Sequence, residues 1–178
     1  MRTVIERYYT QLFIINCGGK EYEDFYINIH ANELCIVGLA PTHPALKQTI
    51  KKITLRDNLL KSNVQGTKKR GGHSLFLDTN ICEVTCTDQD QSQDHEFQIK
   101  NCLKGKLVEL NKLLSSDPSL LQNYASTRGY LAIIETDEQP KADQSKGILT
   151  FEEYHTLRNL TITKGPVFQK DTEVGDDE

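Results

Sequence analysis

The stretch from Asn101 to Glu135 constrains the fold more than any other part of the chain, because it contains signals for two strands with a short helix between them. Its first part, residues 105–111, is rich in β-prone side chains and ends at Asn111, a residue type that favours turns. After Gly129 breaks the chain, the apolar run at 130–134 predicts a strand that is buried on both faces. Two paired strands are therefore expected here.

The middle of this stretch predicts a helix. Asp117 followed by Pro118 is typical of a helix start, with Asp117 as the N-cap and Pro118 at the first helical position. Leu120, Leu121 and Tyr124 would form the apolar face of this helix.

Short strand patterns recur over the remainder of the chain, and no alternation of strands with long helices is present. We expect strands at 12–15, 24–30 (half-buried), 33–39, 50–55, 74–77, 81–87 and 97–101. A short helix is expected near residues 4–9, and Thr150 with Glu153 matches a capping box that opens a second helix ending at Leu157. These patterns predict a mainly β barrel-sandwich with short flanking helices. We expect one domain over residues 1–158 and a disordered acidic tail over 159–178.

Composition excludes several classes of protein. The net charge of −4 and pI near 5.8 argue against a general nucleic-acid binder. No apolar run approaches the roughly 20 residues of a membrane span, so no membrane association is expected. Five cysteines in a chain without a signal-peptide pattern predict reduced, structural thiols in a cytosolic or nuclear protein.

Two family resemblances emerge from the motifs. The order Gly105 to Asn111, Asp117-Pro118 and Gly129-Tyr130-Leu131 resembles the C-terminal half of the glycine-cleavage H protein, a barrel-sandwich hybrid of the lipoyl- and biotinyl-carrier class. Over roughly residues 5–157, the chain more closely resembles the Simiate family, also called Abitram, the actin-binding transcription modulators. That second resemblance rests on the following segments: Glu6-Arg7-Tyr8-Tyr9, Ile36-Val37-Gly38-Leu39-Ala40, His43-Pro44, Val64-Gln65-Gly66, Lys69-Arg70-Gly71 and Gly129-Tyr130-Leu131-Ala132.

The resemblance to Simiate implies a non-enzymatic protein that binds monomeric and filamentous actin. It further implies an influence on filament turnover and on cell protrusions such as filopodia and lamellipodia. The implied location is the nucleus, in speckles, together with the cytoplasm.

The hairpin expected at residues 87–96 decides whether carrier chemistry is present. A lipoyl carrier requires a lysine at the exposed apex, whereas residues 87–94 contain none and Lys100 falls inside the return strand. A biotin-type Met-Lys-Met is also missing, because Met1 is the sole methionine. The sequence therefore predicts an H-protein-like frame that is not lipoylated, with no cofactor.

Other chemistry is weakly indicated. Cys82 and Cys86 fall on one face of their expected strand with Cys102 possible beside them, and a zinc site would also need His73 or His95. Buried free thiols in a small core are far more common. His43, between Pro41 and Pro44, is interpreted as a loop residue. We expect no metal and no catalytic residue.

Charge patterning gives the remaining functional signal. Residues 47–70 are strongly basic, and within them Lys68, Lys69 and Arg70 are the candidate partner surface, on charge alone. Three interpretations stay open: solvated loops, attraction to an acidic protein such as actin, and phosphate contacts of an RNA-binding adaptor. A carrier or accessory protein of the H-protein kind is a further alternative.

Overall fold

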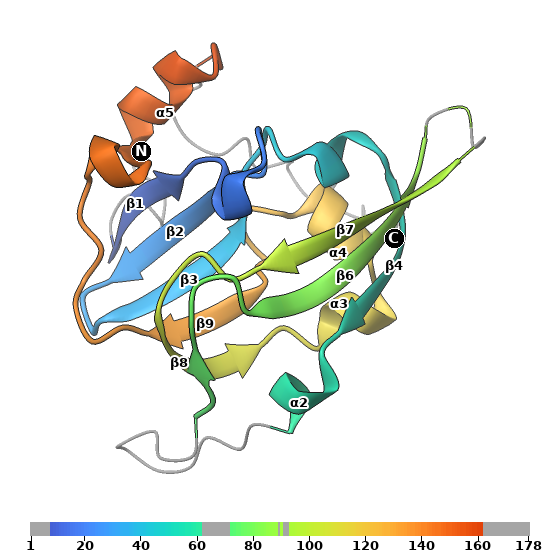
Figure 1. Ribbon diagram of the computed structural model, residues 1–178, viewed down its shortest axis with the longest axis horizontal. Coiled ribbons are helices and arrows are strands. Elements are labelled where there is room, and N and C mark those ends of the chain that lie inside the picture. Colours follow the sequence, from blue (N-terminus) through green and yellow to red (C-terminus); the bar gives the residue numbers. More distant parts are fainter. Residues whose placement is uncertain (1–7, 62–71, 89, 91–92, 162–178) are drawn as a thin grey trace, which may run out of the picture.

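The computed structural model describes residues 8–61, 72–88, 90 and 93–161 (Figure 1). Its strands are β1 (Tyr9–Ile14), β2 (Phe25–His30), β3 (Leu34–Leu39), β4 (Thr49–Leu55), β5 (Ser74–Leu75), β6 (Asn80–Thr87), β7 (Asp94–Lys100), β8 (Gly105–Leu110), β9 (Ala132–Glu135) and β10 (Ile148–Thr150). Its α-helices are α2 (Asp57–Leu60), α3 (Leu113–Ser116), α4 (Ser119–Asn123) and α5 (Phe151–Leu157). Short 3-10 turns occupy Cys17–Gly19, Pro44–Lys47 and Gln144–Lys146. The helix expected near residues 4–9 falls almost wholly outside the described residues.

The strands form two antiparallel sheets, which confirms the predicted mainly β architecture. One sheet has seven strands in the order β10-β1-β2-β3-β9-β8-β5, and the other has three in the order β4-β6-β7. Figure 1 shows the long β6–β7 hairpin extending beyond the body of the molecule at the upper right. The two sheets enclose one main core, to which Ile27 and Leu107 contribute from the large sheet and Val84 and Ile99 from the small one. Each such fully buried aliphatic side chain stabilises the fold by roughly 1.5–3 kcal/mol.

The strand β2 is buried on both faces, so the prediction of a half-buried strand was wrong. Tyr26 and Asn28, which alternate with the core residues, are only 2% and 4% exposed. A second apolar cluster covers part of this outer face, where the ring of Tyr154 from α5 stacks on Phe13 at 4.0 Å between centroids. The side chain of Gln11 donates to Asn28 over the same face. The covering layer comes from a helix far away in the sequence, so strand periodicity alone does not reveal it.

The frame between Asn101 and Glu135 forms largely as expected, with β8 and β9 paired in the large sheet. Gly105 is required by this pairing, because a Cβ there would lie 2.4 Å from the carbonyl oxygen of Glu135. The strand after Gly129 begins only at Ala132, and its second face is half-buried rather than buried. This face is incompletely covered, which corrects the prediction for that strand.

The helix in this frame is correct in place but differs in detail. The Asp117 carboxylate accepts from the backbone N–H of Ser119, as a capping side chain does, while Pro118 occupies the N-cap position of α4. Leu120 and Leu121 are buried, whereas Tyr124 ends the helix and is 46% exposed, contrary to the prediction. Asn111 holds the segment in place, because its amide donates to the carbonyl oxygens of Arg128 and Tyr130 at 2.9 and 2.8 Å.

The predicted capping box of α5 is confirmed. The Thr150 hydroxyl accepts from the backbone N–H of Glu153, and the Glu153 carboxylate accepts from the backbone N–H of Thr150 at 2.8 Å. The residues from 162 onward lie outside the described ranges, so the domain boundary at 158 and the acidic tail stay predictions.

Candidate functional site

The β6–β7 hairpin is the place where a carrier protein of this class would present its lysine. Its strands pair from Asn80 opposite Lys100 to Thr87 opposite Asp94, and the connection between Thr87 and Asp94 forms the tip. Lys100 lies at the end of the hairpin farthest from this tip, where its ammonium is 3.9 Å from the Asp78 carboxylate. Lys100 is therefore inside the return strand, as predicted, and is not placed to carry a swinging arm.

An ion pair lies next to the tip of the hairpin. The ammonium of Lys51, from β4, lies 2.7 Å from the Asp94 carboxylate, and the Thr87 hydroxyl donates to the same oxygen at 2.6 Å. The hydrogen bond from Lys51 and then that from Thr87 lower the pKa of Asp94. His95 is paired with Asp88 at 3.1 Å. The lysine nearest to the tip among these residues is thus engaged with an acid of the hairpin itself.

The basic segment identified from the sequence is only partly described by the structure. Lys68, Lys69 and Arg70 lie outside the described residues, so their place on the surface stays a prediction. Upstream, Lys51 and Arg56 are exposed on or directly after β4, which is an edge strand of the small sheet. The Arg56 guanidinium donates to the Gln98 amide oxygen at 3.2 Å. Part of the basic segment therefore lies directly beside the acidic hairpin.

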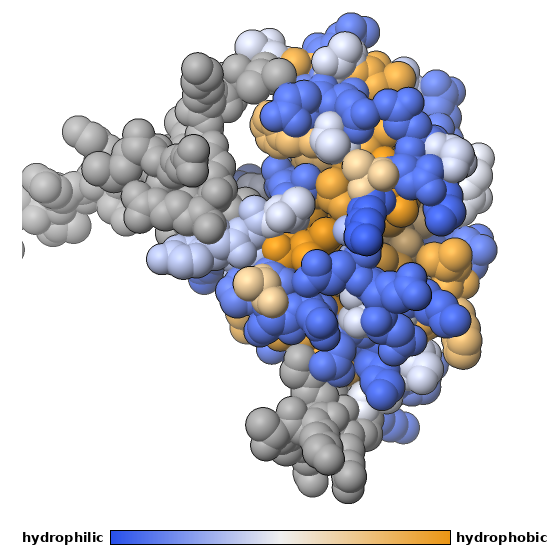
Figure 2. All heavy atoms as spheres, turned by 90° about the vertical axis from the view of Figure 1, so that its left-hand side faces the viewer, coloured by the Kyte–Doolittle hydropathy of each residue, from blue (hydrophilic) through white to orange (hydrophobic). Residues whose placement is uncertain are grey.

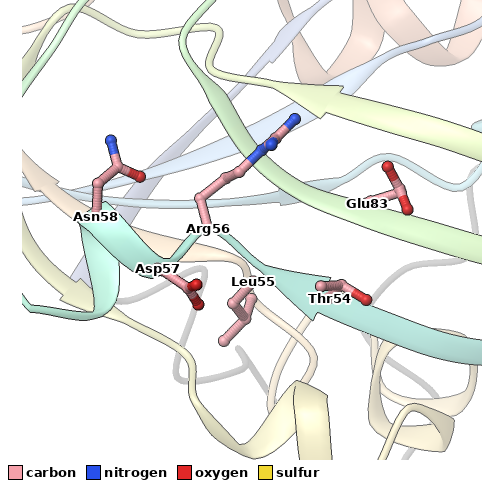
Figure 3. A pocket seen from close by; sticks show the side chains of 6 residues that line it. All are labelled: Thr54, Leu55, Arg56, Asp57, Asn58 and Glu83. Atoms are coloured by element: carbon pink, nitrogen blue, oxygen red, sulfur yellow. The ribbon is translucent and has the colours of Figure 1, made fainter.

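A hollow of about 410 Å³ opens where β4 ends and α2 begins (Figure 3). Its lining consists of Thr54, Leu55, Arg56, Asp57, Asn58 and Glu83. The figure shows the Arg56 and Asp57 side chains pointing away from each other, and Glu83 projecting from the neighbouring strand. The charged groups do not converge on one point, as they would have to for acid–base catalysis.

The five cysteines are free thiols, and four of them are buried. Burial raises the pKa of the Cys82 thiol to about 12, which suppresses the reactive thiolate. His95 faces Cys86 across the β6–β7 pair, yet within the described ranges no three of the His, Cys, Asp and Glu side chains gather in a metal-binding group. The described helices include none that is long and apolar enough to cross a membrane.

Sequence reasoning missed a second basic cluster. Lys100, Lys104 and Lys106 flank the connection from β7 to β8, at the corner where the chain passes between the two sheets. Their spacing is visible in the sequence, but Lys104 and Lys106 belong to the Asn101–Glu135 stretch, whose pattern is explained by the fold, and Lys100 directly precedes it. The connection that bears these lysines runs beside the turn with two exposed apolar residues, Phe76 and Leu77, because the Asn101 amide donates to the Phe76 carbonyl oxygen.

The fold and the hairpin together define a barrel-sandwich of the H-protein kind that has no lysine at its carrier position. The fold is similar to that of a glycine-cleavage system H protein from Mycobacterium marinum, with a TM-score of 0.51 over 76% of this chain and 91% of that protein, at 16% sequence identity. This similarity confirms the predicted fold class. No protein-family model matches the chain.

Sequence relatives then give the family. The chain is 45% identical to protein Abitram of Dictyostelium discoideum, over 96% of this chain and 97% of that protein. It is 36% identical to protein Abitram of Danio rerio, with coverage of 87% and 88%, and 33% identical to that of Homo sapiens, with coverage of 87% and 86%. The chain belongs to the Abitram family, as its motifs predicted.

Proposed function

We propose that this protein is a non-enzymatic actin-binding protein that modulates filament dynamics and cell protrusions, with a nuclear role linked to transcription. The observation that carries the proposal is membership of the Abitram family over nearly the whole chain, since the family name denotes an actin-binding transcription modulator. The corresponding locations are nuclear speckles and the cytoplasm, including actin-rich protrusions.

The hairpin supports a binding role over a carrier role. The region between Thr87 and Asp94 has no lysine in the sequence, and Lys51 beside it is paired with Asp94. A lipoyl arm has no attachment point at the apex, so the H-protein-like frame serves here as a scaffold. The H-protein alternative is consequently not favoured by the site.

Charge supplies the physical basis for binding an acidic partner. Lys68, Lys69 and Arg70 form a run of three cations, and actin has an acidic surface. Complementary charges accelerate and orient association, and their effect weakens as salt increases, because the Debye length falls from about 10 Å at 0.1 M to about 3 Å at 1 M. We assign Lys68, Lys69 and Arg70 a role in steering the protein to actin.

Co-sedimentation with filamentous actin tests this proposal. The Lys68→Glu/Lys69→Glu/Arg70→Glu variant should bind roughly tenfold more weakly than the wild type at low salt, with the difference shrinking as salt rises. The matched control is Lys112→Glu/Lys141→Glu/Lys146→Glu, which makes the same charge change at exposed lysines elsewhere.

Three results would count against it. If the triple variant pellets with actin as well as the wild type does across the salt series, Lys68, Lys69 and Arg70 have no role in actin binding. A wild-type protein that does not pellet with actin would refute actin binding. Salt-dependent binding to RNA without actin binding would instead favour the nucleic-acid adaptor.

A further inference from the structure

Two large apolar side chains stand exposed next to each other at one corner of the molecule. Phe76 and Leu77 are each 62% exposed, the largest values among the large hydrophobic side chains of the described ranges. They lie in the turn that leaves β5 at the edge of the large sheet and enters β6 in the small sheet. On the face of the molecule shown in Figure 2, exposed hydrophobic residues lie in separate groups between hydrophilic residues. An adjacent exposed pair is therefore a feature that needs an explanation.

The turn that bears this pair is firmly held by the rest of the protein. Asn101, which is 1% exposed, donates from its amide to the carbonyl oxygens of Phe76 and Leu103 at 3.0 and 2.6 Å. Its backbone N–H donates to the carbonyl oxygen of Thr79 at 2.7 Å, and its own carbonyl accepts from the N–H of Asp78. The Thr79 hydroxyl accepts from the N–H of Phe76. The backbone of the turn is thus fixed while the Phe76 and Leu77 side chains are exposed, so little backbone conformational entropy is lost when a partner covers them.

Three lysines lie on the chain segments next to the pair, together with the acids Asp78 and Glu135, of which Glu135 lies opposite Lys106 in the β8–β9 pair. Asn101 belongs to the crossover from β7 to β8, which runs beside the Phe76 turn (green and yellow-green in Figure 1). Lys100 precedes this crossover and Lys104 ends it, while Lys106 lies opposite Ser74 in the β5–β8 pair. Asp78 is the acid of the turn, and its carboxylate lies 3.9 Å from the Lys100 ammonium. An apolar centre with a charged rim is the usual anatomy of a protein-binding surface.

We propose that Phe76 and Leu77, with the rim of Lys100, Lys104 and Lys106, form the docking surface through which this protein holds actin. This inference rests on the proposed function, which supplies the partner. The matching surface on the partner is an apolar pocket bordered by acidic side chains: the pocket receives Phe76 and Leu77, and the acids face the lysines. The apolar contact determines the dissociation rate, while the lysine rim contributes mainly to the association rate and its salt dependence.

A membrane surface is the competing occupant, and the observations favour a protein. Two side chains offer less buried hydrocarbon than a myristoyl chain, which by itself gives only marginal and reversible membrane binding. A protein pocket can add hydrogen bonds and shape complementarity that a bilayer does not provide.

The test is co-sedimentation of the full chain with filamentous actin, using Phe76→Ser/Leu77→Ser. This variant should bind at least tenfold more weakly, with unchanged circular dichroism and thermal midpoint, because only exposed side chains are replaced and every hydrogen bond of the turn involving Phe76 uses its backbone. The matched control, Leu113→Ser/Leu157→Ser, removes two apolar side chains that are 58% and 51% exposed elsewhere, and should bind like the wild type. Lys104→Gln/Lys106→Gln should flatten the salt dependence of binding.

The outcomes separate this inference from the proposed function. If the wild type binds actin and Phe76→Ser/Leu77→Ser binds equally well, the docking surface is refuted and actin binding stands. If the wild type does not bind actin, both fail. If the wild type binds vesicles containing phosphatidylserine and loses that binding in Phe76→Ser/Leu77→Ser, the surface belongs to a membrane and the inference is overturned.

Discussion

At the scale of single residues, His43 is the side chain whose environment differs most from its expected one. The sequence places it in a proline-flanked loop, yet it is 0% exposed and lies between the rings of Phe25 and Phe97, at 5.9 and 6.0 Å between centroids. Its Nδ1 accepts from the backbone N–H of Ala45, while Nε2 has no partner within the described ranges. Burial lowers the pKa of His43 to about 4, because a buried imidazolium would lose its hydration.

This burial predicts a pH dependence of folding. The unfolded chain binds a proton at His43 near pH 6.5, whereas the folded chain does so only near pH 4, so stability is lost as the pH falls through this window. The loss amounts to about 3 kcal/mol in the free energy of unfolding once the pH is below 4. Urea unfolding at intervals between about pH 7 and about pH 3.5 measures this loss.

The control for this prediction is His43→Asn. The amide introduced by this substitution would keep an oxygen for the Ala45 N–H but has no group that titrates in this range. The variant should show a distinctly smaller loss of stability over the same interval. Equal losses in the variant and the wild type would mean that His43 does not contribute, and that carboxylates elsewhere account for the acid sensitivity.

At the scale of secondary-structure elements, the end of α5 is attached to the core by a buried ion pair. The Arg158 guanidinium donates to both oxygens of the Asp24 carboxylate, at 2.8 and 2.9 Å, and the side chain of Asp24 is 0% exposed. The Thr42 hydroxyl donates to the same carboxylate at 2.8 Å, and the Tyr22 ring lies 4.5 Å from the guanidinium carbon. This network joins the C-terminal helix to the residue that precedes β2.

The network predicts that Arg158→Met destabilises the protein by about 3–5 kcal/mol, because a buried carboxylate loses its counter-charge. Asp24→Asn/Arg158→Met should be clearly more stable than Arg158→Met alone, since the unpaired charge is then also removed. Guanidinium unfolding of the wild type, Asp24→Asn, Arg158→Met and the double variant gives the coupling. If the effects of the two substitutions on the free energy of unfolding are additive, the ion pair is not the source of the destabilisation.

The same elements show how far sequence reasoning reaches. The capping box of α5 and the start of α4 were predictable, because each depends on residues within one helical turn. The burial of the outer face of β2 was not predictable, because Tyr154 and Asp24 contact their partners only through tertiary packing. The candidate site shows the same limit. The absence of a lysine at residues 87–94 can be read directly from the sequence, whereas the contact of Asn101 with Phe76 depends on two crossovers between the sheets.

At the scale of the whole molecule, the fold is similar to that of a glycine-cleavage H protein, while residues 87–94 between β6 and β7 contain no lysine. The strands of the hairpin, the glycine at 105 and the frame up to Glu135 are all in place, while the apex is acidic and Lys100 lies at the opposite end of the hairpin. A protein with this fold could carry a lipoyl or biotinyl group on another lysine, or it could act as a rigid scaffold for a binding surface.

The second use predicts that the protein isolated from its native source carries no lipoyl or biotinyl group. Attachment requires a lysine at a tight, exposed apex, and Lys51, beside the tip of the hairpin, is both within a sheet strand and paired with Asp94. The intact mass should therefore contain no such adduct, and the glycine-cleavage H protein from the same source, measured alongside, should show its lipoyl group. If peptide mapping finds a lipoyl or biotinyl group on any lysine of this chain, the carrier function is supported and the scaffold interpretation is refuted.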